Sequence, residues 1–292
     1  MDFEGQHNHN LIIMDDSYSQ SRRKPMTICI AAIASESKNE CIVLATDHMV
    51  TIDIGERVLG KFEHTIKKYR TIQPNCIAMI AGNPVLLNDL LKDTGDIGEY
   101  DKIKDKIFEN FKNKRDETIQ NEMLDIYGVD KGFLKDLLLT KDLNPVSEEI
   151  LKVLLDFNLG TSILLVGFNN DGLGVISEIN ENRVTDITDL HFSAIGSGQI
   201  QAVNTLYFQS HTKEMDVLTA VYNVFKAKSN AEVHEGVGKE TDLLILRAKS
   251  CSKLTKSQLE ILKQIYNEEL AFGAKHKDLK KLRLKTGCEL CY

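Results

Sequence analysis

The sequence predicts a layered α+β fold built on antiparallel sheets, and three observations lead to this prediction. Short apolar runs rich in β-branched residues occur in pairs separated by polar turns, at 26–47, 65–81 and 161–179. Leucines and isoleucines at helical spacing fill the section from 85 to about 157. Along the chain the order is strands, helices, strands, helices, strand, which favours hairpins and separate helical layers over alternating βαβ units.

The first half of the chain contains two expected hairpins. One joins strands at 26–34 and 41–47 through the polar turn 35–40, and the other joins 65–72 and 76–81 through Gln73-Pro74-Asn75. The segment between them, including the stretch from Val50 to His64, is expected to be a long connecting loop with Gly55 in it. After the second hairpin, Gly82-Asn83-Pro84 ends the strand and opens a helix, because proline suits a first helical turn.

The second half continues with helices and strands. Ser147 is the expected N-cap of a helix that ends the long helical section. Strands follow at 161–168 and 174–179 around the turn Asn169-Asn-Asp-Gly172, and a shorter strand follows at 192–195. Helices are expected at 200–208, 215–227 and 257–269, with a buried strand at 241–247 before the last of them.

Composition limits the possible functions. We expect a flexible N-terminal extension over 1–25, a domain over 26–250 with an enlarged helical section at 85–157, and a C-terminal helix and charged tail over 251–292. The net charge of -7 gives no support to nucleic-acid binding, and the apolar runs are too short for a membrane span. The six cysteines lack disulfide-framework spacing, which favours a reduced, cytoplasmic protein. Cys288-x-x-Cys291 is half a zinc site at most, and no phosphate loop or HExxH motif is present, so no cofactor and no metal are expected.

Four residues at the ends of expected strands could support hydrolysis. A hydroxyl is a weak nucleophile until a base takes its proton. If Thr27 were the first residue of a mature chain, its α-amine, with a pKa of about 7.7–8.0, could be that base, and a nearby lysine would lower this pKa further. Lys68, Asp47 and Gly82 could then supply the cation, the carboxylate that holds it, and an amide for the oxyanion. The alternative is that these charged residues are solvated strand ends.

The order and distances of these pieces resemble proteasome-type subunits of the N-terminal-nucleophile (Ntn) hydrolase superfamily. The resemblance is strongest to bacterial proteasome-like proteins that begin Met-Thr-x-Cys-(Ile/Val)-Ala. It runs in order from about residue 26 to 247. The matching pieces are Met26-Thr-Ile-Cys-Ile-Ala31, Leu44-Ala-Thr-Asp47, Thr65-Ile-Lys-Lys68, Ala81-Gly82, Leu164-Leu-Val-Gly167, Ala194-Ile-Gly-Ser-Gly198 and Gly236-Val-Gly-Lys-Glu-Thr-Asp242.

This resemblance implies a fold, an activity and a site. The fold would be a four-layer αββα sandwich of two antiparallel sheets, and the activity that of a threonine protease acting on peptides or proteins within a ring-like homo-oligomer. It implies that Thr27 is the nucleophile, with Asp47, Lys68, Gly82 and Ser197 completing the catalytic site. An apolar specificity pocket would be lined by Val50, Ile66 and Ile80, each of which could equally be a core residue.

The sequence also departs from the family pattern. Met26 stands where self-processing members carry glycine, so Thr27 could be exposed by a start at Met26, by another protease, or not at all. Glu235 and Gly238 stand where the family has an acid and a serine. These departures leave two alternatives: a non-catalytic scaffold or gating subunit that keeps its extension, and an amidase for a small non-peptide amide. His48, His64, His234 and Cys29 lie near the site segments, but loop or core roles are preferred for them.

Overall fold

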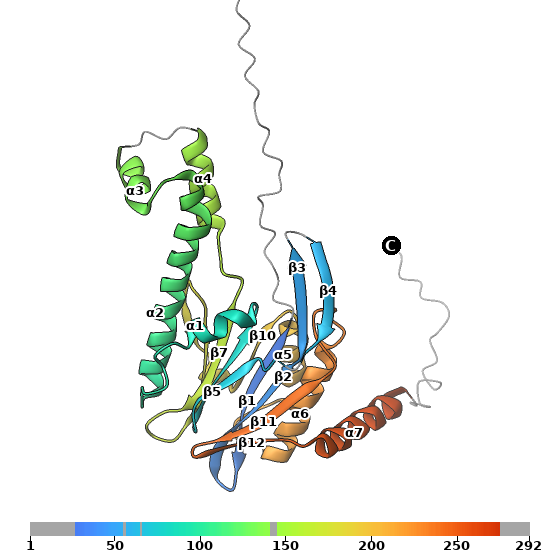
Figure 1. The fold of residues 1–292 in the computed structure, drawn as a ribbon. Helices are drawn as coiled ribbons and strands as arrows, with labels where there is room; N and C mark the ends of the chain where they lie inside the picture. The colour runs from blue at the N-terminus through green and yellow to red at the C-terminus, as the bar shows by residue number, and fades with distance from the viewer. Residues whose placement is uncertain (1–26, 55–56, 65, 141–144, 275–292) are drawn as a thin grey trace, which may run out of the picture.

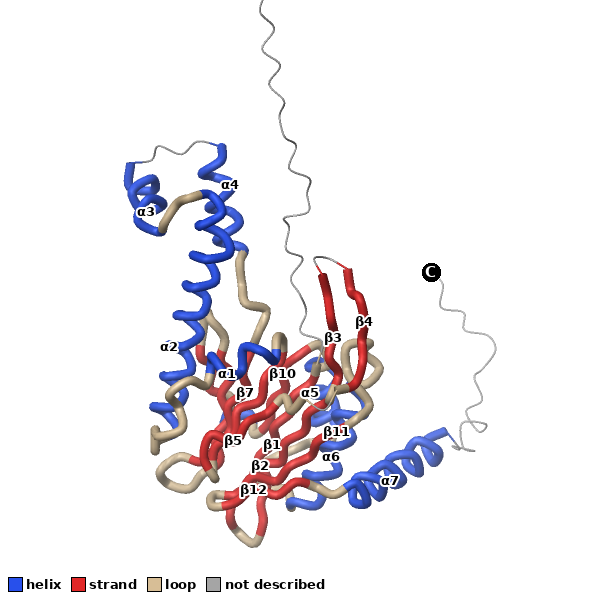
Figure 2. Tube along the Cα trace, viewed as in Figure 1, coloured by secondary structure: helices blue, strands red, loops and turns tan. Residues whose placement is uncertain are grey.

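The computed structural model describes residues 27–54, 57–64, 66–140 and 145–274. Two five-stranded antiparallel sheets and one two-stranded ribbon form its β structure, and helices lie on two sides of the strands (Figures 1 and 2). The α+β class and the two antiparallel sheets agree with the prediction from sequence. Among the described helices, none combines the length and hydropathy needed to cross a bilayer.

The first sheet has the strand order β10-β1-β2-β11-β12. Its strands are β1 (Ile28–Glu36), β2 (Asn39–Asp47), β10 (Phe192–Gly196), β11 (Thr241–Arg247) and β12 (Ser250–Lys253). Ser37 and Lys38 both have positive φ, 50° and 72°, so the turn between β1 and β2 is tighter than the six-residue turn expected from sequence. β12 was not predicted, and the expected domain boundary after residue 250 falls inside it.

The second sheet has the order β5-β6-β7-β8-β9. It consists of β5 (Tyr69–Gln73), β6 (Cys76–Ala81), β7 (Ser162–Phe168), β8 (Gly174–Ile179) and β9 (Val184–Asp186). The β5–β6 and β7–β8 hairpins were both predicted, whereas the short edge strand β9 was not.

The helices are distributed between the two outer sides of the sheets and a projecting arm. They are α1 (Leu87–Leu90), α2 (Tyr100–Ile119), α3 (Lys131–Thr140), α4 (Pro145–Asp156), α5 (Gln199–Phe208), α6 (Val217–Ala231) and α7 (Lys256–Ala274). Single turns, 3-10 in type except for one π turn at 120–124, are η2 (Pro84–Leu86), η3 (Gln120–Leu124), η4 (Asp125–Tyr127) and η5 (Thr188–Leu190). Helix α4 begins two residues before Ser147, so Ser147 lies within the first turn and is buried rather than being the N-cap.

Three apolar clusters separate four layers. Alternate residues of a strand point to opposite faces, so Ile28 and Ile30 of β1 pack against α5 and α6, while Cys29 and Ala31 face the second sheet. A third cluster lies between the outer face of the second sheet and helices α1 and α2. The order is therefore helices, sheet, sheet, helices, which is compatible with a sandwich fold.

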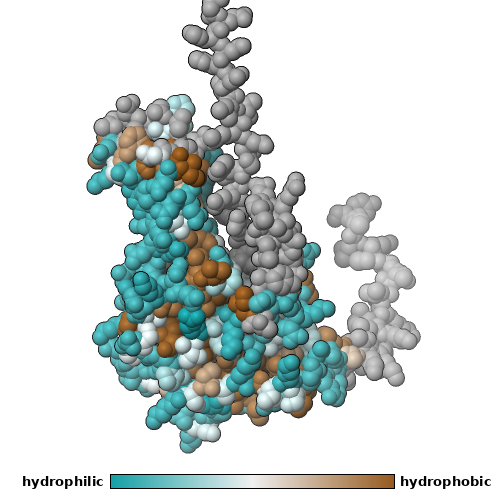
Figure 3. Space-filling model, viewed as in Figure 1, coloured by the Kyte–Doolittle hydropathy of each residue, from teal (hydrophilic) through white to brown (hydrophobic). Residues whose placement is uncertain are grey.

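Two features project from one end of the sandwich (Figure 1). The first is a ribbon of β3 (Met49–Ile54) and β4 (Arg57–Glu63), where a connecting loop was expected. The second is an arm formed by α2, α3 and α4. Apolar side chains are exposed towards the tip of this arm (Figure 3), including Phe133, Leu139 and Leu155 at 50%, 72% and 83%.

Candidate active site at the end of the two hairpins

The topology of the two hairpins brings four strand ends together. Thr27 immediately precedes β1, and Asp47 is the last residue of its antiparallel partner β2. Lys68 immediately precedes β5, and Gly82 immediately follows β6. The two hairpins pack face to face, since Cys29 Sγ donates to the carbonyl oxygen of Ile80 across the sheets at 3.4 Å.

Thr27, Asp47 and Lys68 form a single hydrogen-bonded cluster. Asp47 Oδ1 accepts from Thr27 Oγ1 at 2.5 Å, from the Ile28 amide at 3.1 Å and from Lys68 Nζ at 2.8 Å. Lys68 Nζ also donates to Thr27 Oγ1. The three side chains are 1%, 0% and 4% exposed, so the ion pair lies in the protein interior, where charge–charge interactions are strong.

The second oxygen of Asp47 is held by two backbone amides. Asp47 Oδ2 accepts from Met49 at 3.2 Å and from Gly238 at 2.8 Å. With these, the carboxylate accepts hydrogen bonds on both oxygens, which fixes its orientation.

Ser197 lies against the backbone of Thr27. Its Oγ accepts from the Thr27 amide and donates to the Thr27 carbonyl, both at 3.3 Å. Gly196 allows this approach because a Cβ there would lie 2.2 Å from the Thr27 carbonyl oxygen, and its φ is +107°. Ser197 is thus hydrogen-bonded to the nitrogen that would be the free amine of a chain starting at residue 27.

Gly82 also has a backbone conformation that requires glycine. Its φ is +114°, and a Cβ would lie 2.3 Å from the carbonyl oxygen of Gly160. The next residue, Asn83, donates its amide to Thr161 Oγ1 at 3.2 Å. Gly82 therefore turns the chain sharply at the end of β6.

Two of the three residues expected in an apolar pocket have described side chains, Ile66 and Ile80. The side chain of Val50 lies outside the part of the chain that the structure describes. Ile66 is 40% exposed, two residues before Lys68. The side chain of Ile80 is 1% exposed and packs between the second sheet and the outer helices.

The histidines near the site have partners other than Thr27. His48 Nε2 lies 3.0 Å from Asp242 Oδ1, while the Nδ1 atoms of His64 and His234 accept from the amides of nearby Ile66 and Gly236.

Cys29 is fully buried, and burial raises the pKa of its thiol well above its usual range. Because a thiolate is needed for attack, this excludes Cys29 as an alternative nucleophile.

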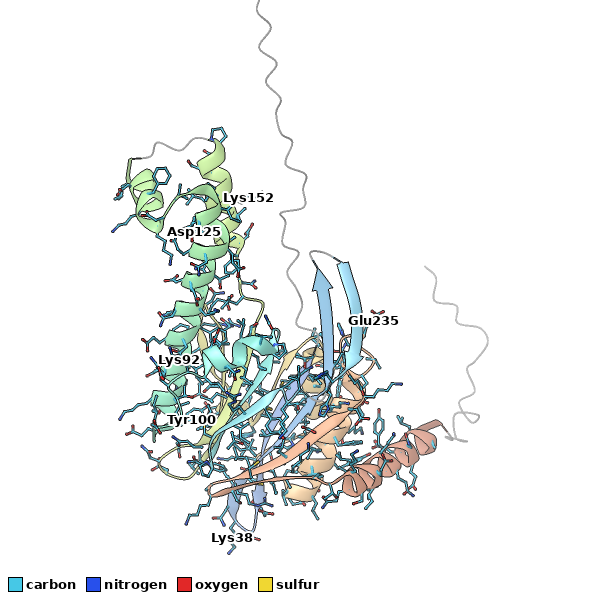
Figure 4. The ribbon with its side chains drawn as sticks, viewed as in Figure 1. Lys38, Lys92, Tyr100, Asp125, Lys152 and Glu235 are labelled. Atoms are coloured by element: carbon cyan, nitrogen blue, oxygen red, sulfur yellow. The ribbon has the colours of Figure 1, made fainter. Side chains whose placement is uncertain are left out.

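Helix α6 and the loop after it make two contributions that the sequence did not predict. Gly238, expected only to stand in for a serine, supplies its amide to Asp47. Lys228 of α6 is 0% exposed and donates to the carbonyl oxygen of Gly238 at 2.7 Å. Figure 4 shows Glu235 in the same loop, beside the β3–β4 ribbon.

The cluster contains three of the groups that acyl transfer by an oxygen nucleophile uses. It combines a hydroxyl, an ammonium bonded to that hydroxyl and a carboxylate that orients both. In the described ranges, no group of three or more His, Cys, Asp or Glu side chains is arranged to hold a metal ion.

Comparison with known proteins gives a fold likeness and no family. No known family's sequence profile matches the chain, and no curated protein matches it. Among solved structures, the chain is similar to Anbu from Hyphomicrobium sp. strain MC1, solved as a Gly-1 mutant. The TM-score is 0.56 and the identity 12%, and the alignment covers 86% of this chain and 97% of that chain.

These findings correct one prediction from the sequence. The motifs led to the identification of the chain as a proteasome-type subunit of the Ntn hydrolase superfamily, and this identification does not stand. The overturning finding is that the likeness to Anbu, a proteasome-like bacterial protein, amounts to a TM-score of 0.56 at 12% identity. Such a likeness shows the fold alone, an α+β arrangement of two antiparallel sheets and helices.

Proposed function

We propose that the chain is a threonine-type amide hydrolase that acts on peptides or proteins through Thr27. The observation that carries the proposal is the buried contact of Thr27 Oγ1 with both Lys68 Nζ and Asp47 Oδ1. An ammonium bonded to a hydroxyl oxygen stabilises the negative charge that develops there during attack.

The proposed reaction begins once the bond between Met26 and Thr27 has been cleaved. The α-amine of Thr27 takes the Oγ1 proton, and Oγ1 attacks the substrate carbonyl carbon. The Gly82 amide receives the oxyanion, and the protonated amine returns its proton to the leaving amine as the C–N bond breaks. Water then attacks the acyl ester with the amine again as base, which releases the acid and restores Thr27. In this proposal Ser197 orients the amine, in line with its contacts to the Thr27 backbone.

Cleavage before Thr27 is essential to this proposal. Thr27 is 1% exposed and its nitrogen belongs to a peptide bond, so the intact chain offers neither an amine base nor an accessible hydroxyl. The same observation favours a second candidate, a non-catalytic scaffold or gating protein in which residue 27 stays internal.

The test compares the full chain with a chain that starts at Thr27, released from a cleavable fusion. Thr27→Ala in the same format is the control, and Thr27→Ser retains a hydroxyl. We expect the Thr27-first chain to hydrolyse fluorogenic peptide amides, and its Thr27→Ser variant to do so at a lower rate. The full chain and the Thr27→Ala variant should be inactive. An epoxyketone should add one mass equivalent to residue 27.

The outcomes separate the candidates. Turnover of small acyl amides without peptides would support the amidase alternative. If the Thr27-first chain neither turns over any amide nor takes up the probe, the hydrolase proposal is wrong and the scaffold candidate remains.

We further propose that the chain self-associates into a ring-like homo-oligomer. Support comes from its fold likeness to Anbu, a proteasome-like protein. Sedimentation of the full chain and the Thr27-first chain tests this, and a monomer in both would contradict it.

A further inference from the structure

Lys228 is a buried cation whose donors are all used by one loop. Its side chain is 0% exposed on α6, a position where an ammonium is unfavourable unless it is fully bonded. Nζ donates to Glu232 Oε1 at 2.7 Å, to the Gly238 carbonyl at 2.7 Å and to the Lys239 carbonyl at 2.8 Å. An ammonium has three N–H donors, so the segment after α6 satisfies all of them.

This loop reaches the candidate active site through Gly238. The Gly238 carbonyl accepts from Lys228, and the Gly238 amide donates to Asp47 Oδ2 at 2.8 Å. On the other side of the loop, Glu63 Oε1 accepts from the amides of Lys239 and Glu240. One residue thus connects the buried ammonium to the carboxylate that holds Thr27 and Lys68.

The fit of the loop against β3 leaves no room for a side chain at Gly238. A Cβ there would lie 2.9 Å from the Met49 nitrogen and 3.0 Å from Glu63 Oε1. The loop is packed closely at this point, and a shift of the loop would carry the Gly238 amide away from Asp47 Oδ2.

The surroundings of Lys228 lower its pKa on balance. Burial lowers the pKa of Lys228, and the carboxylates of Glu232, Asp47 and Glu63 act in the opposite direction. These acids come from three different segments of the chain: the end of α6, β2 and β4.

We propose that Lys228 is a positioning residue for the Thr27 site. By fixing the loop at Gly238 it places the amide that orients Asp47, and Asp47 in turn orients Lys68 and the Thr27 hydroxyl. The proposal rests on the proposed function of that site. It differs from the role given to Lys68, because Lys228 acts only through the loop.

The test uses the Thr27-first chain with Lys228→Met, and Lys226→Met as the matched control. Lys226 precedes Lys228 by two residues on α6, and its ammonium pairs with Glu269 rather than with the loop after α6. The readouts are hydrogen exchange of the peptide covering 236–241, and kcat and KM on a fluorogenic peptide amide. We expect Lys228→Met to speed exchange in this peptide and to lower kcat roughly 10- to 100-fold with KM unchanged, since small misplacements of catalytic groups have effects of that size. Lys226→Met should match the parent chain in both readouts.

Several results would overturn the proposal. Unchanged exchange in Lys228→Met means that the lysine does not hold the loop, and faster exchange with unchanged kcat means that the loop does not position the site. Faster exchange throughout the protein, with kcat and KM both altered, indicates a general structural role instead.

A second variant covers the case in which Lys228→Met does not fold. Gly238→Ala displaces the loop while Lys228 stays in place, and it should lower kcat in the same way; parental kcat in Gly238→Ala would overturn the proposal. If the parental Thr27-first chain shows no turnover, the proposed function fails and this proposal fails with it. An active parent with an equally active Lys228→Met variant refutes this proposal alone.

Discussion

The cluster around Asp47 makes a quantitative prediction about stability that does not depend on any activity. The perturbation is a double-mutant cycle of Asp47→Asn and Lys68→Met in the full chain. The two side chains are 0% and 4% exposed, and their atoms Oδ1 and Nζ are 2.8 Å apart. Each single variant leaves an interior charge without its counter-ion, whereas the double variant leaves none.

The magnitudes follow from the remaining partners. After Lys68→Met, Asp47 still accepts from the Thr27 hydroxyl and from the three amides at 28, 49 and 238, so we expect a loss near the lower end of the range for broken buried pairs, about 3 kcal/mol. In Asp47→Asn the single carbonyl oxygen can face the amides of Met49 and Gly238 or that of Ile28, but not both sets. At least one buried N–H then loses its acceptor, which adds about 1–3 kcal/mol to the effect of the unpaired ammonium.

The double variant contains no unpaired charge, and its remaining defect is the buried N–H that has lost its acceptor. We therefore expect it to be about 3 kcal/mol more stable than the sum of the single losses predicts, the upper end of measured coupling energies. Urea unfolding followed by circular dichroism gives the four free energies, and equal slopes show that the same surface is exposed in each. A cycle of Glu99→Gln and Lys102→Met is the control, since that pair is 50% and 66% exposed and its coupling should stay below about 1 kcal/mol. If the losses in unfolding free energy of Asp47→Asn and Lys68→Met add up to that of the double variant within about 0.5 kcal/mol, the two side chains are not coupled and the hydrogen-bonded cluster is refuted.

Three further predictions concern other buried positions. Burial lowers the pKa of His211, so the unfolded chain takes up the proton first; the free energy of unfolding should fall as the pH drops through about 6.5 towards the lower folded pKa, more steeply than in His211→Gln. Urea titrations at several pH values check this, and parallel declines would contradict it. Gly82→Ala should destabilise the protein by about 2 kcal/mol or more, because its φ is +114° and a Cβ would lie 2.3 Å from the Gly160 carbonyl oxygen. Gly95→Ala, with open space at its Cβ, should have the same Tm as the parent in a thermal scan. Equal Tm values for Gly82→Ala and Gly95→Ala would be evidence against backbone strain at Gly82. Cys29 should stay unlabelled by iodoacetamide at about pH 8 in the folded protein and react in urea, because burial keeps its thiol protonated; mass mapping of a native adduct would disprove this.

The sequence predicted the two hairpins because a hairpin is a local feature. Apolar runs rich in β-branched residues and turn residues such as Gln73-Pro74-Asn75 favour β1–β2 and β5–β6 without reference to the rest of the chain. Once the hairpins exist, Thr27 must lie beside Asp47. The structure brings Lys68 to the same cluster, and its catalytic role stays a prediction.

Other features could not be predicted because their causes are not local. Nothing near Lys228 in the sequence separates it from Lys226, which pairs with Glu269, since the partners of Lys228 come from the segment that follows α6. Strand alternation shows that Ile80 and Met79 face opposite ways, but it does not say which faces the other sheet; Met79 does. Within the described ranges, the β3–β4 ribbon pairs with no third strand, and it belongs to neither five-stranded sheet.

The buried charges themselves favour a chemical role for the site. Asp47, Lys68 and Lys228 are 0%, 4% and 0% exposed, and interior ion pairs are often less stabilising than apolar side chains of similar size. One structural reason to keep such charges is to specify strand register. Here the tight turn at Ser37 and Lys38 already sets the β1–β2 register. Since register does not require the charges, the arrangement of Asp47 and Lys68 around one hydroxyl is better explained by what that hydroxyl does, because proteins tend to break the rules of core composition where function demands it.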